Sequence, residues 1–202
     1  LGLGVLVGLI PMQRAQGQET GASSFVAPSP NVPQAAVGRV ATVTVPPFTP
    51  YSAALVHVNE TYNGELGTTF TYVPWDGYPI TNLTHSANSG VTCSHDADLK
   101  ITCTGSNITW VVIDYDFEYL VSDYSADLLV LGWGGTSNYA LDFTIHLVYP
   151  APLSYVGAYA TEPVSVTATE VTWFMENTTQ LYGYGYFRDE RISVVSLPLL
   201  EQ

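Results

Sequence analysis

RVATVTV at residues 39–45 and FTIHLVY at residues 143–149 place mainly Val, Ile or Leu on one face and Thr or His on the other. VSVTAT at residues 164–169 repeats the pattern with Ser and Thr as the polar partners. Successive side chains of a strand point to opposite faces, so an alternation with period two is typical of half-buried antiparallel strands. These stretches predict an all-β fold.

Strand signals recur along the rest of the chain, whereas helix signals do not. Pro and Gly clusters separate them, for example Pro46-Pro47, the GWGG stretch at 132–135 and the PAP stretch at 150–152. With 202 residues and 47% hydrophobic side chains, the chain has enough material for one sizeable core. We therefore predict a single antiparallel β-sandwich, jelly-roll or pilin-like, over residues 35–202. The predicted strands cover residues 36–45, 53–58, 68–73, 92–93, 99–103, 107–113, 128–131, 141–149, 164–169, 171–175, 182–187 and 191–197.

Residues 1–12, LGLGVLVGLIPM, form a strand pattern with one bulky face, made of Leu1, Leu3, Val5, Val7 and Leu9. The other face is mostly glycine. A helix is disfavoured here because each of three glycines costs about 1 kcal/mol relative to Ala. Twelve residues also fall short of the roughly 20 that span a bilayer, so we expect no membrane span.

Residues 13–34 are polar, small and interrupted by proline, which is the composition of a linker. An exposed apolar strand on a linker is an aggregation template unless it has a host sheet. We therefore expect residues 1–12 to be a donor strand that inserts into the sheet of another molecule. Two alternatives stay open, namely a first strand of the chain's own domain and the remnant of a signal peptide.

The charge balance is acidic, with 18 Asp and Glu against 5 Lys and Arg and a net charge of −13. Such a chain lacks the basic patch that nucleic acid requires, so we expect no nucleic-acid partner. With only 11% charged residues, the surface needs another source of hydration. N-linked glycans are expected at the four Asn-X-Ser/Thr sequons, unless these arise incidentally in Thr-rich strands. The sequons are Asn59, Asn82, Asn107 and Asn177.

Cys93 and Cys103 lie in VTCSHDADLKITC, two short strand fragments around an Asp-rich turn. We predict a disulfide across this hairpin, which persists only in an oxidising compartment and so indicates a secreted chain. A metal site that includes His95 is the alternative, but the four-ligand spacing of zinc motifs is missing.

Catalytic motifs are not found, so we predict that the chain is not an enzyme and has no cofactor or metal. The acidic groups Asp96/Asp98 and Asp114/Asp116/Glu118 offer oxygen ligands for calcium, but neither matches an EF-hand loop. The alternative is that they are solvated carboxylates. The stretch at 181–187, LYGYGYF, puts three tyrosines on one face, which favours cross-strand packing over a sugar-stacking platform.

Taken together, the leader, the linker, the Thr-, Val- and Tyr-rich sandwich, the sequons and the scarcity of lysine resemble the subunit of the archaeal thread. This is a glycosylated extracellular filament of thermoacidophilic archaea. The resemblance implies that each subunit lends an N-terminal strand to complete the sandwich of its neighbour. It gives the donor role to the bulky leader face and glycosylation to the four sequons. The expected partners are other copies of the chain, and the expected location is the outside of the cell surface. A secreted carbohydrate-binding or adhesion domain is the second hypothesis, and a secreted hydrolase the third.

Overall fold

The computed structural model describes residues 37–49, 53–74, 79–120, 123–125 and 128–191. These residues form strands and no helix, which confirms the predicted all-β class. Consequently, none of them belongs to a helix that could cross a membrane. The predicted donor strand and linker lie outside the described residues. The long strands are β2 (Ala53–Tyr72), β5 (Ile101–Leu120), β7 (Leu128–Val148) and β10 (Glu170–Asp189). The short strands are β1 (Gly38–Thr44), β3 (Ile80–Ala87), β4 (Thr92–His95), β6 (Asp123–Ser125), β8 (Leu153–Ala158) and β9 (Ser165–Val166).

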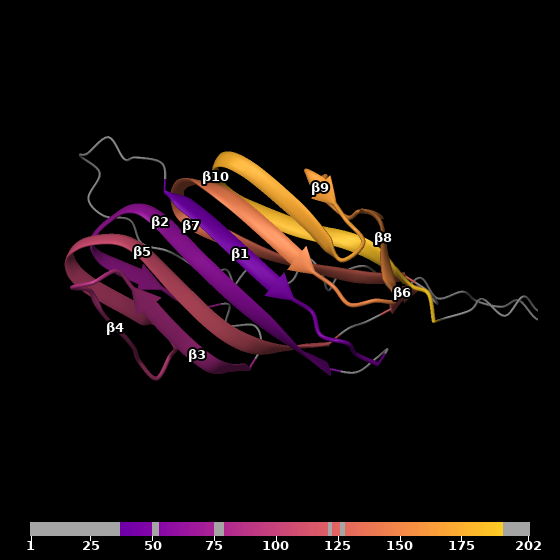
Figure 1. Ribbon diagram of the computed structural model, residues 1–202, viewed down its shortest axis with the longest axis horizontal. Helices are drawn as coiled ribbons and strands as arrows, with labels where there is room; N and C mark the ends of the chain where they lie inside the picture. The colour runs from indigo at the N-terminus through magenta and orange to yellow at the C-terminus, as the bar shows by residue number, and fades with distance from the viewer. Residues whose placement is uncertain (1–36, 50–52, 75–78, 121–122, 126–127, 192–202) are drawn as a thin grey trace, which may run out of the picture.

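All the strands belong to one hydrogen-bonded sheet in the order β3-β5-β2-β1-β7-β10-β8. The sheet also holds β4 beside β5, β6 beside β7 and β9 beside β10. Neighbours are antiparallel, as predicted, with one difference among the described strands, because β1 and β7 run parallel. β1 therefore joins two antiparallel groups, which Figure 1 shows on either side of it. Strands β2 to β5 lie on one side, and β6 to β10 on the other.

Each long strand runs through stretches that the sequence analysis assigned to two shorter strands. β2 covers the predicted strands at 53–58 and 68–73, and β10 covers those at 171–175 and 182–187. The junctions are marked by register shifts, between Asn63 and Gly67 in β2 and between Met175 and Thr178 in β10. A β-bulge bends a strand and increases its twist without ending the pairing. The polar residues between the predicted strands therefore mark bends within one continuous strand rather than the ends of two.

The glycines of the GWGG stretch lie inside β7 and do not end it. Tyr182 of β10 crosses Gly134, so that a Cβ atom there would overlap the tyrosine ring. A Cβ atom on Gly132 would likewise overlap the carbonyl oxygen of Gly183. Glycine is required at these positions because β7 and β10 approach each other too closely for a side chain.

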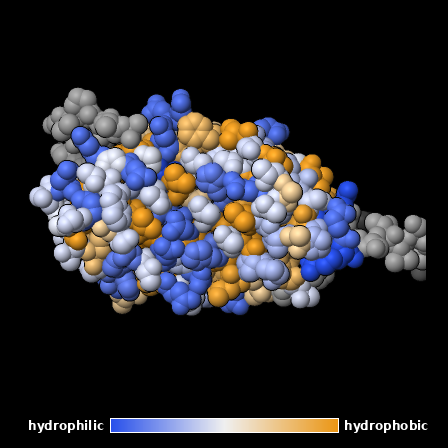
Figure 2. Space-filling model, viewed as in Figure 1, coloured by the Kyte–Doolittle hydropathy of each residue, from blue (hydrophilic) through white to orange (hydrophobic). Residues whose placement is uncertain are grey.

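One core lies on the inner face of the sheet, with side chains from both groups of strands. Phe143, Ile145 and Leu147 of β7 are buried, as the alternation of FTIHLVY predicts. Trp133 and Trp173 are among the largest fully buried side chains. On the face drawn in Figure 2, hydrophobic residues form small groups among hydrophilic ones.

Candidate assembly surface and polar clusters

The sheet divides where β1 begins. β1 lies between β2 and β7, and its first residue, Gly38, is opposite Asn63 of β2 and Asp142 of β7. Further along, residues 67–72 of β2 pair with β5, and residues 130–135 of β7 pair with β10. Each of these two stretches has a second edge, on the side away from β5 or β10, and no described strand pairs with it. We call these two edges, residues 67–72 of β2 and 130–135 of β7, the β2/β7 opening.

The buried side chain of Arg39 contacts both sides of the β2/β7 opening. The guanidinium carbon of Arg39, in β1, lies 5.9 Å from the ring centre of Tyr72 in β2 and 5.0 Å from that of Trp133 in β7. Its Nη1 donates a hydrogen bond of 3.2 Å to the carbonyl oxygen of Thr136. Arg39 is 0% exposed, so this cation is enclosed by the core.

Glu60 of β2 balances that charge. Its Oε2 accepts hydrogen bonds from Arg39 Nε at 2.9 Å and from the Tyr62 hydroxyl at 3.1 Å, and Arg39 Nη2 lies 2.7 Å away. Its Oε1 accepts from the hydroxyls of Tyr115, at 2.9 Å, and of Tyr72. Both carboxylate oxygens therefore have several donors, the condition under which a buried charge is tolerated.

Burial controls the protonation of this cluster. Burial alone would lower the pKa of Arg39, but the charge and hydrogen bond of Glu60, together with the electrostatic effects of Tyr62 and Tyr72, outweigh it and raise that pKa. Burial raises the pKa values of Tyr62, Tyr72 and Tyr115 well above the ordinary tyrosine value. The three hydroxyls stay protonated and can donate to the carboxylate. We call these five residues the Arg39–Glu60 cluster.

Next to the Arg39–Glu60 cluster, the indole Nε1–H of Trp133 is buried and has no hydrogen-bond acceptor among the described residues. The Trp133 ring also packs edge-on against Phe143, with ring centres 6.0 Å apart. Buried donors in folded proteins nearly always have a partner, so an orphaned one needs an explanation.

The predicted donor residues Leu1, Leu3, Val5, Val7 and Leu9 lie outside the described residues, so their role stays a prediction.

The predicted sequons lie at four different places in the sheet. Asn82 and Asn177 have left-handed backbone angles, with φ of 55° and 49°, and both lie at register shifts of their strands. Asn107 is exposed in β5. Asn59 is half-buried within β2, and its amide donates a hydrogen bond of 3.0 Å to Asp114.

The acidic residues Asp114 and Asp116 of β5 bind neighbouring side chains on the outer face. His57 Nδ1 lies 2.9 Å from an oxygen of Asp116, and His57 Nε2 lies 3.2 Å from one of Asp114. The Asn82 amide donates to Asp116 at 2.6 Å. Burial would raise the pKa of Asp116, but the hydrogen bonds from Asn82 and His57 outweigh it and lower that pKa. Within the described ranges, no three or more His, Cys, Asp or Glu side chains gather into a metal-binding group.

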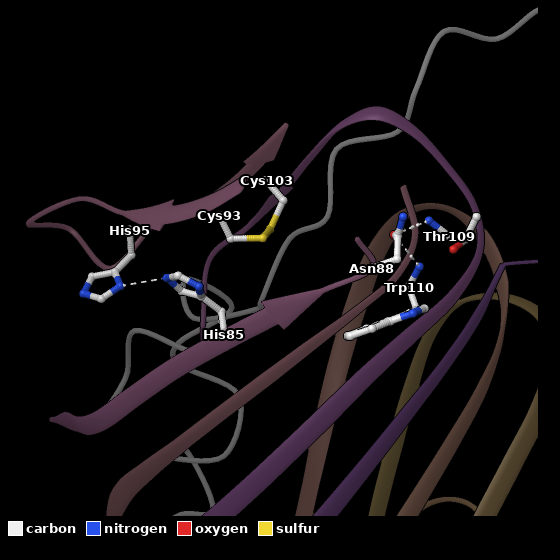
Figure 3. Close-up of a disulfide and its surroundings, with 7 residues drawn as sticks. All are labelled: His85, Asn88, Cys93, His95, Cys103, Thr109 and Trp110. Atoms are coloured by element: carbon white, nitrogen blue, oxygen red, sulfur yellow. Dashed lines mark hydrogen bonds between the residues drawn. A yellow bond between two sulfur atoms is a disulfide. The ribbon is translucent and has the colours of Figure 1, made fainter. Parts of the chain in front are cut away.

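The disulfide between Cys93 and Cys103 is present, as predicted. The two residues are directly opposite in the β4/β5 pairing, with Cα atoms 4.0 Å apart (Figure 3). Asp96 orders the turn between these strands, because its Oδ1 accepts the backbone N–H groups of Asp98 and Lys100.

Tyrosines of β10 form a row on the outer face, in the register that the sequence predicts. Tyr182 is 40% exposed and Tyr159, from the chain after β8, is 42% exposed. Tyr159 packs edge-on against Tyr184 and Tyr186, with ring centres 6.4 and 5.7 Å apart. We call these four residues the tyrosine row.

The Arg39–Glu60 cluster was not predicted from the sequence. A signal existed, because Arg39 shares its strand face with Ala41 and Val43, and Glu60 shares its face with Val56 and Val58. Two opposite charges at inward positions of neighbouring strands indicate a buried ion pair.

No protein-family model and no curated protein matches this chain. Among solved structures, an aminopeptidase N family protein from Idiomarina loihiensis is similar at 12% identity and a TM-score of 0.42. A putative nutrient-binding protein from Legionella pneumophila follows at 8% identity and 0.40, and an M1 zinc metallopeptidase from Deinococcus radiodurans at 11% and 0.33. The matches cover 75%, 83% and 74% of this chain and 29%, 71% and 42% of the respective structures. At this level of similarity we base no functional argument on them.

Proposed function

We propose that this chain is a structural subunit of an extracellular filament and that residues 1–12 of one copy insert as a strand into the sheet of the next copy. The observation that carries the proposal is the β2/β7 opening. Residues 67–72 of β2 and 130–135 of β7 each have an edge without a described partner strand. A strand added here has backbone hydrogen-bond partners on both sides.

The leader carries the apolar side chains that a strand buried at this position needs. Leu1, Leu3, Val5, Val7 and Leu9 share one face, which would turn toward the core. Their burial contributes about 2 kcal/mol each, or about 10 kcal/mol before the ordering costs of association. The Nε1–H of Trp133, which has no acceptor among the described residues, would gain one from a backbone carbonyl of the added strand. The glycine-rich face of the leader would turn outward.

Donor and acceptor lie on different parts of the chain, so the contact is heterologous and repeats from copy to copy. Such a contact propagates head to tail into a fibre unless the rotation closes a ring. The Cys93–Cys103 disulfide supports an oxidising location outside the cell.

Glycans at Asn59, Asn82, Asn107 and Asn177 are part of the proposal. The exposed positions of Asn107 and Asn177 favour modification there, whereas the side-chain amides of Asn59 and Asn82 are hydrogen-bonded to Asp114 and Asp116. Intact mass of natively purified filaments measures the occupancy. A mass equal to the bare 21.8 kDa polypeptide would contradict glycosylation and would leave the strand exchange untouched.

Charge on the buried face of the leader tests the filament proposal. The double variant Val5→Asp, Val7→Asp, kept near neutral pH so that the carboxylates stay ionised, should give soluble monomers and no fibres in electron micrographs. The control is Gln13→Asp, Gln16→Asp, which adds the same charge in the linker and should assemble normally. Normal fibres from the leader variant would contradict the proposal, as would an equal loss of fibres in the leader and linker variants.

A secreted carbohydrate-binding domain is the second candidate, and the tyrosine row favours it. Exposed tyrosine rings such as Tyr159 and Tyr182 offer apolar faces with polar tips, which suit stacking on sugars. The same leader variants separate the two candidates. A binding domain stays monomeric with or without the added charge, and its affinity for an oligosaccharide array falls in Tyr159→Ala and Tyr182→Ala.

A further inference from the structure

His85 and His95 face each other at the margin of the sheet. His85 lies in β3 and His95 in β4, and His95 Nδ1 is 3.3 Å from His85 Nε2. The rings stand at 75° to each other with centres 5.4 Å apart. Figure 3 shows the two nitrogens directed at one another beside the disulfide. This pair has no part in the proposed assembly.

Both histidines are carried by strands that β5 fixes. His85 is opposite Ile113 of β5, and His95 is opposite Ile101 of the same strand. The Cys93–Cys103 disulfide ties β4 to β5 two residues before His95. The backbones are therefore held before any ligand arrives, which lowers the ordering cost of binding.

The loop between β3 and β4 is held as well. Asn88 Nδ2 donates a hydrogen bond of 2.9 Å to the carbonyl oxygen of Asn107, and Asn88 Oδ1 accepts the Thr109 N–H at 2.8 Å. The start of the connection between β3 and β4 is therefore held against β5 by these two hydrogen bonds.

We propose that His85 Nε2 and His95 Nδ1 bind one Zn²⁺ ion. With Zn–N bonds of about 2.0–2.1 Å, two nitrogens 3.3 Å apart subtend about 105–110° at the metal, which is the tetrahedral angle. At this angle the ion lies beside the line that joins the two nitrogens, so its binding displaces the hydrogen bond between them.

The chemistry of the surroundings favours an ion that binds imidazole nitrogen. Cys93 and Cys103 are bonded to each other and cannot act as thiolates, so the ligands are imidazoles, which suit zinc and not magnesium or calcium. His95 is exposed and His85 half-buried, so the ion can reach the site and water can fill the other two positions. The described residues supply no third ligand, so we expect moderate affinity.

Calorimetric titration of the tag-free, disulfide-intact chain with ZnCl₂ at about pH 7.5 tests this site. We expect one ion per chain, no response to MgCl₂, and an affinity at least about tenfold weaker in both His85→Gln and His95→Gln. The matched control is His57→Gln, which removes the histidine bound to Asp114 and Asp116 and should leave zinc affinity unchanged.

A second measurement on the unmodified chain does not depend on the folding of variants. In imidazole NMR spectra, Zn²⁺ should shift the resonances of His85 and His95, and those of His57 and His146 should stay in place. A dissociation constant weaker than about 1 mM would overturn the proposal, as would unchanged affinity in both glutamine variants or a loss that follows His57→Gln.

Discussion

Replacing Glu60 with glutamine should destabilise the folded chain by about 3–5 kcal/mol, because it leaves the Arg39 charge buried without a counterion. Arg39 and Glu60 are both 0% exposed, so water cannot take over the lost interactions. The amide also puts an N–H donor where the carboxylate accepts from Arg39, Tyr62, Tyr72 and Tyr115. The loss of the ion pair and the mismatch of hydrogen-bond donors both lower the free energy of unfolding.

The assay is urea denaturation at neutral pH with the disulfide intact, together with thermal melting. For a chain of 202 residues, each kcal/mol lowers the melting temperature by about 2–4 °C. The control is Glu65→Gln on the exposed side of the same strand, which should stay within about 0.5 kcal/mol of the parent.

A second variant keeps the test informative if Glu60→Gln does not fold. Adding Arg39→Met to Glu60→Gln removes the isolated charge, so the double variant should be more stable than Glu60→Gln alone. The reasoning would be refuted if Glu60→Gln lowered the free energy of unfolding by less than about 1 kcal/mol, which is the range of exposed ion pairs. It would also be refuted if the double variant were less stable than Glu60→Gln alone.

Three further predictions concern the disulfide, the glycines and an acidic residue. Serine at both Cys93 and Cys103 should lower the free energy of unfolding by about 3 kcal/mol, measured in urea against the oxidised parent, and equal stability would contradict this. Gly183→Ala should cost about 1–3 kcal/mol because its Cβ would lie 2.6 Å from a buried tryptophan ring, whereas Gly157→Ala, with open space around it, should be neutral. Hydrogen bonds from Arg191 lower the pKa of the Asp189 carboxyl. The contribution of Asp189 to stability is therefore present above the carboxyl pKa of the unfolded chain, and it is lost as the pH falls through the lower pKa of the folded chain. Asp189→Asn should therefore reduce stability at neutral pH and flatten its acid dependence, and parallel curves of the free energy of unfolding against pH for parent and variant would exclude this.

The sequence predicts the four long strands in pieces, without their full lengths, and misses β3, β6 and β8. Alternation in FTIHLVY is a local property of the backbone, so the buried face of β7 follows directly from it. The continuity of β7 through residues 132–135 is not local. It depends on tyrosines of β10 that cross these glycines, and that contact is set by strands far apart in the sequence. The parallel pairing of β1 with β7 is likewise a property of the topology.

The same distinction holds for the polar sites. The Cys93–Cys103 bond is predictable because both residues lie in one hairpin. The pairing of Arg39 with Glu60 requires the register of β1 on β2, although the inward position of each charge is visible in its own strand. The approach of His85 to His95 depends on two strands held by different parts of β5, for which the sequence carries no local signal.

The most direct test of the central proposal is a cryo-electron microscopy map of the native filament, traced from one subunit to the next. The account predicts that residues 1–12 of one copy lie between residues 67–72 and 130–135 of the adjacent copy, hydrogen-bonded on both sides, with Leu1, Leu3, Val5, Val7 and Leu9 toward the core. A map in which the β2/β7 opening is filled by residues of the same chain, or in which residues 1–12 contact no neighbouring copy, would contradict it.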